Sequence, residues 1–448
     1  MRRAAVAGLA IAGAATARAL TERGVEVRLA DDRPVEAHRL LADELGAELV
    51  DLAAPTGPGR LLEDADVLVP APGIPPAHPL VVEALRRGIP VRSEIDLAYE
   101  WEQQRPGGPR PLIGVTGTDG KTTTTMLVAH MVRALGLRAA EVGNTDLPFV
   151  AALGSDAQVF VVECSSFRLQ WTEQFRCESS VWLNISADHL DWHCTVPEYA
   201  AAKARLWAHV GSGDTAVAPA GDSSILAVAR DSAARVVTFG AEGADYRVEG
   251  DWLAGPRGRV VPVAGLWRDL PHDVSNSLAA LAVVSESGLA ADGTALAGAL
   301  GSFVPPRHRI EFVLERDGTR WFDDSKATSP HAALAAIRGF DRLVLVAGGR
   351  NKDLDLTALA AEPERMAGVV AIGESAALVA AAFADSCPVV IAASMAEAVR
   401  AAADLAVPGV DVLLSPGCAS FDWYDGYASR GDDFQRCVRR LAEGKDRP

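Results

Sequence analysis

This 448-residue sequence lacks any closely paired cysteines, because its six cysteines are scattered and no C-x-x-C pair occurs. The spacing excludes the usual zinc-binding patterns and gives no sign of a dense disulfide framework. Reduced, buried thiols in a cytoplasmic protein are therefore the better interpretation.

Long apolar runs and excess positive charge are also missing. No apolar run reaches the ~18 residues that a transmembrane helix requires. Lysine and arginine total 43 against 59 aspartates and glutamates, for a net charge of −16. We therefore expect no nucleic-acid partner and no membrane attachment, and an anionic substrate would have to be held by local cations and backbone amides.

The N-terminus supports two interpretations. Two arginines, an apolar stretch and an Ala-x-Ala motif in MRRAAVAGLAIAGAATARAL are typical of a secretory signal. The same residues also fit a strand at Ala4–Ala7, a glycine turn, a helix at Ala14–Arg23 and a second strand at Val25–Ala30. A cleaved peptide need not continue into a well-formed βαβ unit, so the second interpretation is favoured.

Length and pattern together predict three α/β domains, since a domain averages about 150 residues. Strand and helix patterns alternate up to a Pro- and Gly-rich linker at residues 103–111, and a parallel α/β pattern returns after about residue 304. We predict a Rossmann-like domain at 1–106, a central P-loop-type ATPase domain at 107–305 and a second Rossmann-like domain at 306–448.

The strongest local motif is Thr116-Gly-Thr-Asp-Gly-Lys-Thr, between a strand pattern at 111–116 and helical spacing from Met126. Glycine-turn amides and a helix N-terminus suit a phosphate, Lys121 would reach its outer oxygens, and Thr122 would suit Mg²⁺. The strict Walker A pattern is not met, because Val115 stands where its first glycine belongs. Phosphate binding is still favoured over a turn with a solvated lysine.

A second glycine loop, Gly8-Leu-Ala-Ile-Ala-Gly, has alanine where dinucleotide-binding loops have their middle glycine. A nucleotide other than NAD fits this pattern, and Asp31 or Asp32 could contact its ribose or base. The loop Pro70–Pro79 follows a strand, and it is either a ligand loop or a proline-rich turn.

Several polar residues follow predicted strands near the phosphate loop. Glu163, Asp188 and His189 could hold Mg²⁺. Taken singly, His189 is better explained as a surface-loop histidine, and Lys203 as a lysine on a solvated helix face. Lys326 follows a strand and could face a cleft between domains.

The order of these motifs resembles the Mur ligase family over essentially the whole chain. The matching segments are Thr116-Gly-Thr-Asp-Gly-Lys-Thr, Glu163-Cys-Ser-Ser-Phe, Leu183-Asn-Ile-Ser-Ala-Asp-His, Tyr199-Ala-Ala-Ala-Lys, Pro306-Arg-His-Arg and Asp324-Ser-Lys-Ala-Thr. The last of these, together with Ser415-Pro-Gly-Cys-Ala-Ser-Phe-Asp, resembles the member that adds D-glutamate. The phosphate loop is shared with folylpolyglutamate synthases, which begin at that loop and so lack a domain like residues 1–106.

The resemblance implies an ATP-dependent amide ligase of peptidoglycan synthesis, a cytoplasmic monomer with UDP-binding, ATPase and amino-acid-binding domains. ATP would convert the carboxylate of UDP-N-acetylmuramoyl-L-alanine into an acyl phosphate. The amine of D-glutamate would then attack, and phosphate would leave from a tetrahedral intermediate. Such a reaction needs cations where charge accumulates on the phosphoryl oxygens.

The resemblance also implies the site residues. ATP would be held by Gly117, Thr118, Asp119, Gly120, Lys121, Thr122, Thr123, Asn276, Arg309 and Asp324. Mg²⁺ would be held by Thr122, Glu163, His189 and Lys203, with Lys203 carbamylated by CO₂. The UDP-sugar would contact Asp31, Asp32, Arg33, Gly73 and Asn144. The amino acid would contact Lys326, Thr328, Ser420 and Tyr427. Lys121, His189, Lys203 and Lys326 are the implied catalytic residues.

Four positions depart from the family pattern: Asp146, Arg168 (usually glutamine), Asp273 (usually asparagine) and Tyr427 (usually phenylalanine). These departures bear on which substrate is bound more than on which reaction is catalysed. D-glutamate is expected because Lys326 and Thr328, opening a helix after a strand, and Ser420 can anchor two carboxylates. L-glutamate, another amino acid, and a scaffold that binds nucleotide without catalysis are the alternatives.

Overall fold

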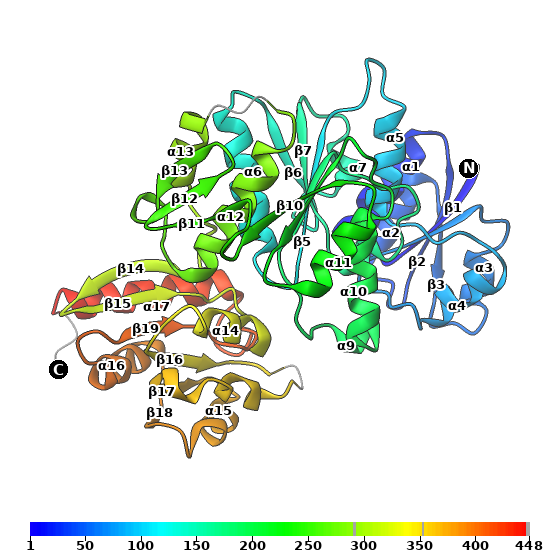
Figure 1. Cartoon of the computed structure of the whole chain (residues 1–448). Coiled ribbons are helices and arrows are strands. Elements are labelled where there is room, and N and C mark those ends of the chain that lie inside the picture. The colour runs from blue at the N-terminus through cyan, green and yellow to red at the C-terminus, as the bar shows by residue number, and fades with distance from the viewer. Residues whose placement is uncertain (290–292, 352–353, 445–448) are drawn as a thin grey trace. The chain divides into compact units, whose positions relative to one another are not determined.

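The structure is a computed structural model that describes residues 1–289, 293–351 and 354–444. The chain forms two compact units, one of Met1–Asp269 with Asp273–Phe303 and one of Leu270–His272 with Val304–Pro448. Three sheets with four, nine and six strands make up the fold (Figure 1). The predicted α/β fold class is confirmed, and the domain boundaries after residues 106 and 305 stay predictions.

The first sheet is parallel, in the order β3-β2-β1-β4. Its strands are β1 (Arg3–Ala7), β2 (Glu26–Asp31), β3 (Glu48–Asp51) and β4 (Val67–Pro70), with helices α1 (Ile11–Glu22), α2 (Glu36–Leu45), α3 (Gly57–Leu61), α4 (Pro79–Arg86) and α5 (Glu94–Gln103). Residues 89–92 form no strand, since only Val91 pairs there, in an isolated bridge with Leu68. Pro90 has no N–H to donate, and the chain turns into α5 at Glu94.

The central sheet has the order β13-β12-β11-β10-β9-β8-β5-β7-β6. Its strands are β5 (Leu112–Thr116), β6 (Ala139–Gly143), β7 (Val159–Glu163), β8 (Ser179–Trp182), β9 (Thr215–Pro219), β10 (Arg235–Gly240), β11 (Tyr246–Glu249), β12 (Trp252–Gly255) and β13 (Gly258–Pro262). The sheet is parallel from β6 to β11, and β11, β12 and β13 are antiparallel. Since β5 lies between β7 and β8, the carboxyl ends of these three strands meet at one edge, where parallel sheets bind ligands.

Helices cover both faces of this sheet. They are α6 (Lys121–Ala134), α7 (Phe149–Ala152), α8 (Ser166–Leu169), α9 (Leu190–His193), α10 (Val196–Ala204), α11 (Ser223–Asp231), α12 (Pro271–Ser285) and α13 (Gly293–Ser302). One apolar core joins the sheet to α6, α12 and α13, and a second joins it to α5, α7 and α11. Both faces of β5 are therefore buried, which explains its continuous apolar sequence.

The second unit is built on the sheet β14-β15-β19-β16-β17-β18, parallel except for the β14–β15 pair. Its strands are β14 (Glu311–Arg316), β15 (Thr319–Asp323), β16 (Leu343–Gly348), β17 (Met366–Ile372), β18 (Val389–Ile391) and β19 (Asp411–Leu414), with helices α14 (Pro330–Ile337), α15 (Ala376–Phe383), α16 (Met395–Leu405) and α17 (Tyr427–Ala442). Lys326 and Thr328 do not open a helix as expected. The helix begins at Pro330 because Ser329 caps it, accepting from the N–H of Ala332.

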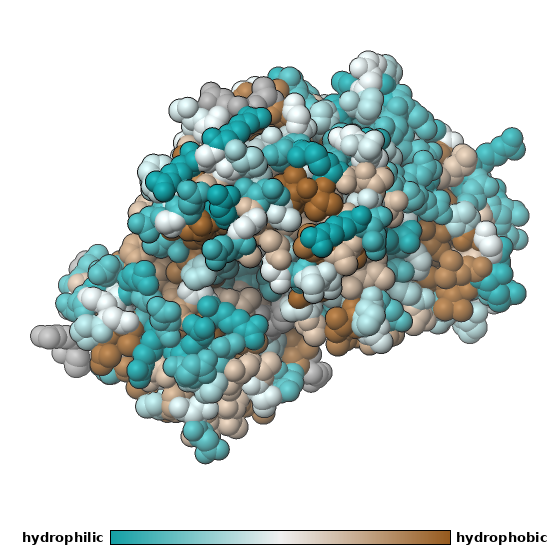
Figure 2. Space-filling model, in the orientation of Figure 1, coloured by the Kyte–Doolittle hydropathy of each residue, from teal (hydrophilic) through white to brown (hydrophobic). Residues whose placement is uncertain are grey.

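The face of the molecule drawn in Figure 2 is mostly polar. Hydrophilic residues dominate it, and hydrophobic ones lie in separate patches. Within the described ranges, no helix combines the length and apolarity required to span a bilayer.

Candidate functional site

The phosphate loop lies between β5 and α6, flanked by the ends of β7 and β8. Gly120 has a φ of +78°, in the left-handed region that favours glycine. A Cβ there would lie 2.5 Å from the amide oxygen of Asn276. Backbone conformation and close approach both require glycine, and Asn276 of α12 lies against the N-terminus of α6.

The loop is held by residues that follow β8. The N–H groups of Thr118 and Asp119 donate to the Asn184 side-chain oxygen at 3.0 and 2.9 Å. The Thr118 hydroxyl accepts from the N–H of Ser186 at 3.0 Å and from the Tyr199 hydroxyl at 3.2 Å. Asn184 and Tyr199 were not predicted as site residues, although both lie in the motifs that suggested the site.

Two lysines converge on this loop. The Lys121 ammonium donates to the carbonyls of Gly117 and Thr118 at 3.0 and 2.7 Å, and the Lys203 Nζ donates to the Gly117 carbonyl at 2.6 Å. Lys203 is only 1% exposed, so it is not a solvated helix lysine. Burial, reinforced by the charge of Lys121, holds the pKa of Lys203 well below its usual value.

Glu163, at the end of β7, is a buried carboxylate with one open oxygen. It is 1% exposed, and its Oε1 accepts from the Asn144 amide at 2.9 Å. Its Oε2 is buried and has no hydrogen-bond partner among the described residues. Because a buried carboxylate oxygen without a donor is costly, Glu163 fits a hard cation such as Mg²⁺.

His189 lies at the surface, immediately before α9. Its Nε2 is 3.3 Å from a carboxylate oxygen of Asp188, and its ring packs on Phe167 with 4.7 Å between centroids. His193 stacks on the same Phe167 and shares a 2.9 Å hydrogen bond with the Ser166 hydroxyl. An aromatic cluster therefore positions His189, and its members Phe167 and His193 were missed because nothing in the sequence pairs them.

The residues predicted for the UDP-sugar lie at two strand edges. Asp31 accepts from the N–H groups of Leu9 and Arg33, both at 3.0 Å, and so ties the first glycine loop to β2. Asp32 lies 3.4 Å from the His78 Nε2, which joins the loops after β2 and β4. Arg33 and Gly73 are exposed at the same edge. Asn144 follows β6 in the central sheet and contacts Glu163 instead.

Asp324 is the buried centre of the predicted residues in the second unit. It accepts from the Ser415 hydroxyl at 2.6 Å and from the N–H of Ile310 at 3.2 Å. Burial raises its pKa to about 7, and Arg309 opposes that shift. Arg309 and Asp324 are therefore close enough to interact, as two members of one predicted ATP site should be.

The predicted glutamate residues lie on loops of the same unit. The Lys326 Nζ is 5.8 Å from the centre of the Tyr427 ring. Thr328 is half-buried before α14, and Ser420 is buried after β19.

Arg430 of α17 joins these loops. It donates to the Ser325 hydroxyl and carbonyl, both at 2.9 Å, and to the Cys418 carbonyl at 3.1 Å. It is 1% exposed, and burial lowers its pKa to about 10. Sequence reasoning missed Arg430, which is one of four arginines in α17.

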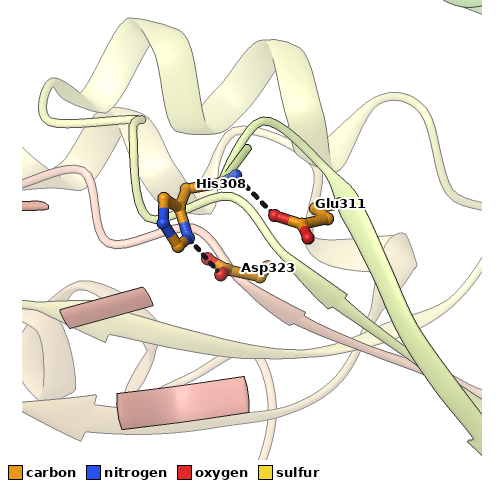
Figure 3. Close-up of side chains that lie close together, drawn as sticks. All are labelled: His308, Glu311 and Asp323. Carbon is orange, nitrogen blue, oxygen red and sulfur yellow. Dashed lines mark hydrogen bonds and ion pairs between the residues drawn. The ribbon is translucent and has the colours of Figure 1, made fainter. Parts of the chain in front are cut away.

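His308, Glu311 and Asp323 form a further polar cluster (Figure 3). The carboxylate of Asp323 is 2.7 Å from His308 Nδ1 and accepts from Gln435 at 2.8 Å and from the N–H of Ser325 at 2.9 Å. Glu311 accepts from the backbone N–H of His308 at 2.8 Å. These hydrogen bonds hold the segment before β14 against β15. The cluster is not the predicted Mg²⁺ site, which was assigned to Thr122, Glu163, His189 and Lys203.

Family profiles match three parts of the chain. They are the Mur ligase MurD-like N-terminal domain at residues 2–93, the Mur ligase middle domain at 115–284 and the Mur ligase glutamate ligase domain at 308–418.

Full-length relatives and solved structures agree with these profiles. A UDP-N-acetylmuramoylalanine–D-glutamate ligase of Frankia casuarinae is 40% identical, over 93% of this chain and 89% of its own. Its counterpart from Pelotomaculum thermopropionicum is 37% identical over 94% of each chain. The crystal structure of the UDP-N-acetylmuramate-alanine ligase MurC from Thermotoga maritima aligns with a TM-score of 0.58 at 18% identity, over 99% of this chain and 100% of its own. MurF from the same organism, in complex with ADP, aligns with a TM-score of 0.59 at 18% identity. The alignment covers 82% of this chain and 92% of the MurF chain. At such identities the two structures establish the fold alone.

Proposed function

Because the chain belongs to the Mur ligase family, we propose that it is the ATP-dependent ligase that joins D-glutamate to UDP-N-acetylmuramoyl-L-alanine in peptidoglycan precursor synthesis. The observation that carries this proposal is the convergence of Lys121 and Lys203 on one loop, next to the strand that ends at Glu163. The names of the relatives supply the substrates.

The chemistry follows from the weakness of a carboxylate as an electrophile. Transfer of the ATP γ-phosphoryl group to the L-alanyl carboxylate would give an acyl phosphate. Attack by the amine of glutamate at the acyl carbon would then release phosphate. Lys121, which now donates to two loop carbonyls, can turn to the phosphoryl oxygens as their charge grows.

A Mg²⁺ ion would neutralise phosphate charge when bound, and Thr122, Glu163, His189 and Lys203 would hold it. The open oxygen of Glu163 supports this assignment. Lys203 suits the role only if its charge is reversed. Its lowered pKa favours the neutral amine, whose nitrogen can attack CO₂ and lose a proton to give an anionic carbamate.

Residues of the second unit are the basis for proposing glutamate as the amino acid that is added. Lys326 and Thr328 would hold one carboxylate of glutamate and Ser420 the other. Tyr427, whose ring faces Lys326, would limit the pocket. An amino acid with a neutral side chain offers only its α-carboxylate, and not the two carboxylates that these residues would hold. L-glutamate stays the runner-up, because chirality depends on where the amine points once both carboxylates are fixed.

We place the reaction in the cytoplasm, where ATP is available, and the free state of all six cysteines agrees with that compartment. A monomer suffices, since one chain supplies every predicted residue.

The deciding experiment measures phosphate release with ATP, UDP-N-acetylmuramoyl-L-alanine and a panel of D- and L-amino acids. We expect release with D-glutamate, at least tenfold faster than with L-glutamate. A tenfold preference for L-glutamate would overturn the acceptor and leave the ligase standing. No release with any amino acid would overturn the ligase in favour of a non-catalytic nucleotide-binding protein.

A further inference from the structure

Asn184, the second residue after β8, binds backbone N–H groups of the kind that a phosphate loop offers to its ligand. Its side-chain oxygen accepts from the N–H groups of Thr118 and Asp119 at 3.0 and 2.9 Å. Its side-chain amide donates back to the Asp119 carbonyl at 3.3 Å. One side chain therefore satisfies three backbone groups of the loop.

The backbone of Asn184 is held as well as its side chain. Its carbonyl accepts from the N–H of Thr118 at 3.1 Å and from the indole N–H of Trp182 at 3.0 Å. Trp182 is 1% exposed and belongs to the core of the central sheet. The N–H of Leu183 donates to the Thr116 carbonyl at 2.9 Å. The core therefore fixes Asn184 in place before any ligand is bound.

The segment that follows Asn184 continues this contact and leads to a proposed metal ligand. The N–H of Ser186 donates to the Thr118 hydroxyl at 3.0 Å. His189 follows three residues later, and its N–H donates to the Asp188 carboxylate at 2.8 Å. The phosphate loop and the segment that carries His189 are therefore joined through Asn184 and Thr118.

The first turn of α6 is left to meet a phosphate. No side chain caps this 14-residue helix, and the first four N–H groups of an α-helix have no acceptor within the helix. The positive end of the helix dipole lies there as well. Thr118 and Asp119 donate their N–H groups to Asn184. The donors for a phosphate are then the first-turn amides, among them Thr122 and Thr123, together with the Lys121 ammonium.

We propose that Asn184 is a positioning residue for nucleotide binding. It occupies the Thr118 and Asp119 amides, so that the loop presents the first turn of α6 to the phosphates. This inference rests on the proposed function, which takes the loop to bind the phosphates of ATP. The role uses an acceptor and a donor on one side chain, and an amide supplies both.

Equilibrium titration with ADP and with adenosine, both with Mg²⁺ present, tests this role. Asn184→Ala should bind ADP about tenfold more weakly, because two amides lose their acceptor and the loop loses its fixed conformation. Adenosine has no phosphate, so its affinity should be unchanged. Retained thermal unfolding transitions check that each variant is folded.

The matched control is Asn351→Ala in the second unit. The Asn351 side chain forms the same kind of two-way bond with backbone, donating to the Leu354 carbonyl at 2.9 Å and accepting from the Leu354 N–H at 3.0 Å. This variant removes an equivalent backbone contact without touching the phosphate loop. It should therefore bind ADP as the wild type does.

Amide hydrogen exchange gives a second measurement, which the wild type alone can decide. Without nucleotide, the Thr118 and Asp119 amides should already be protected, and ADP should add protection at Thr122 and Thr123 instead. In Asn184→Ala, the protection of Thr118 and Asp119 should fall by about tenfold or more. If this variant does not fold, the exchange pattern of the wild type decides.

New protection of Thr118 and Asp119 on ADP binding would overturn the proposal, because these amides would then donate to the phosphates themselves. Unchanged ADP affinity in folded Asn184→Ala would also overturn it, as would an equal loss for adenosine. Failure of the proposed function is a separate result. In that case the wild type would release no phosphate with D-glutamate, while ADP binding would still depend on Asn184.

Discussion

Lys203 in the first unit and Arg430 in the second are both buried basic side chains that donate to backbone carbonyls, and each is 1% exposed. Lys203 makes one such bond, to Gly117, whereas Arg430 donates to Ser325, Cys418 and Ala419. A guanidinium cannot lose its proton at neutral pH, and its donors form a rigid fork, whereas a buried ammonium can become a neutral nucleophile. The difference is what the proposed roles require, with Lys203 buried for its chemistry and Arg430 buried to join loops.

The largest expected effect is at Lys121, which converges with Lys203 on the phosphate loop. Lys121→Ala should lower turnover by about 10²–10³ or more, because it removes a charge contact made in the transition state. Its unfolding temperature should match the wild type, since Lys121 is only half-buried. Near-full turnover in a phosphate-release assay would mean that this loop does not bind the transferred phosphate.

Lys203 tests whether a buried lysine does chemistry. Lys203→Ala should be nearly inactive, and short carboxylates added to the assay should partly restore turnover by replacing the carbamate. Lys203→Arg keeps the positive charge but cannot be carbamylated, so it should be equally inactive and should not respond to carboxylates. Full activity of Lys203→Arg would show that a cation, and not a carbamate, is needed.

Arg430 tests the opposite role. Arg430→Met should destabilise the second unit by about 2–4 kcal/mol, because several buried carbonyls lose their donor. It should raise the KM for glutamate more than it lowers kcat, since Arg430 joins the loops that carry Lys326 and Ser420. The matched control is Arg436→Met on the same helix, where an exposed pair with Asp433 contributes little. If both variants unfolded at the same temperature, Arg430 would not have the proposed role of joining these loops.

The same contrast explains what the sequence could predict. The parallel sheets, the loop after β5 and the strand-end Glu163 follow from local patterns, because strand ends in a parallel sheet gather at one edge. Lys203 was recognised only through the order of motifs, since nothing around it in the sequence shows its burial. Arg430 was missed because its partners Ser325 and Cys418 lie 105 and 12 positions away. The Arg168–Glu94 pair spans 74 positions, and no local pattern links its members.

The smallest expected effect is a pH dependence at Asp324. Burial raises its pKa to about 7 from an ordinary value of 3.8. Between these values the folded protein binds a proton that the unfolded chain does not, so stability should fall as pH rises through this window, by at most about 1.4 kcal/mol per pH unit. Asp324→Asn lacks this titration. The free energy of unfolding of Asp324→Asn, relative to the wild type and without ligand, should therefore rise from about pH 5 to 7 and level off above about pH 7. Urea unfolding at four pH values checks the slope. A difference that stays flat, or that falls with pH, would mean that Asp324 is ionised throughout and that Arg309 and Ser415 outweigh its burial.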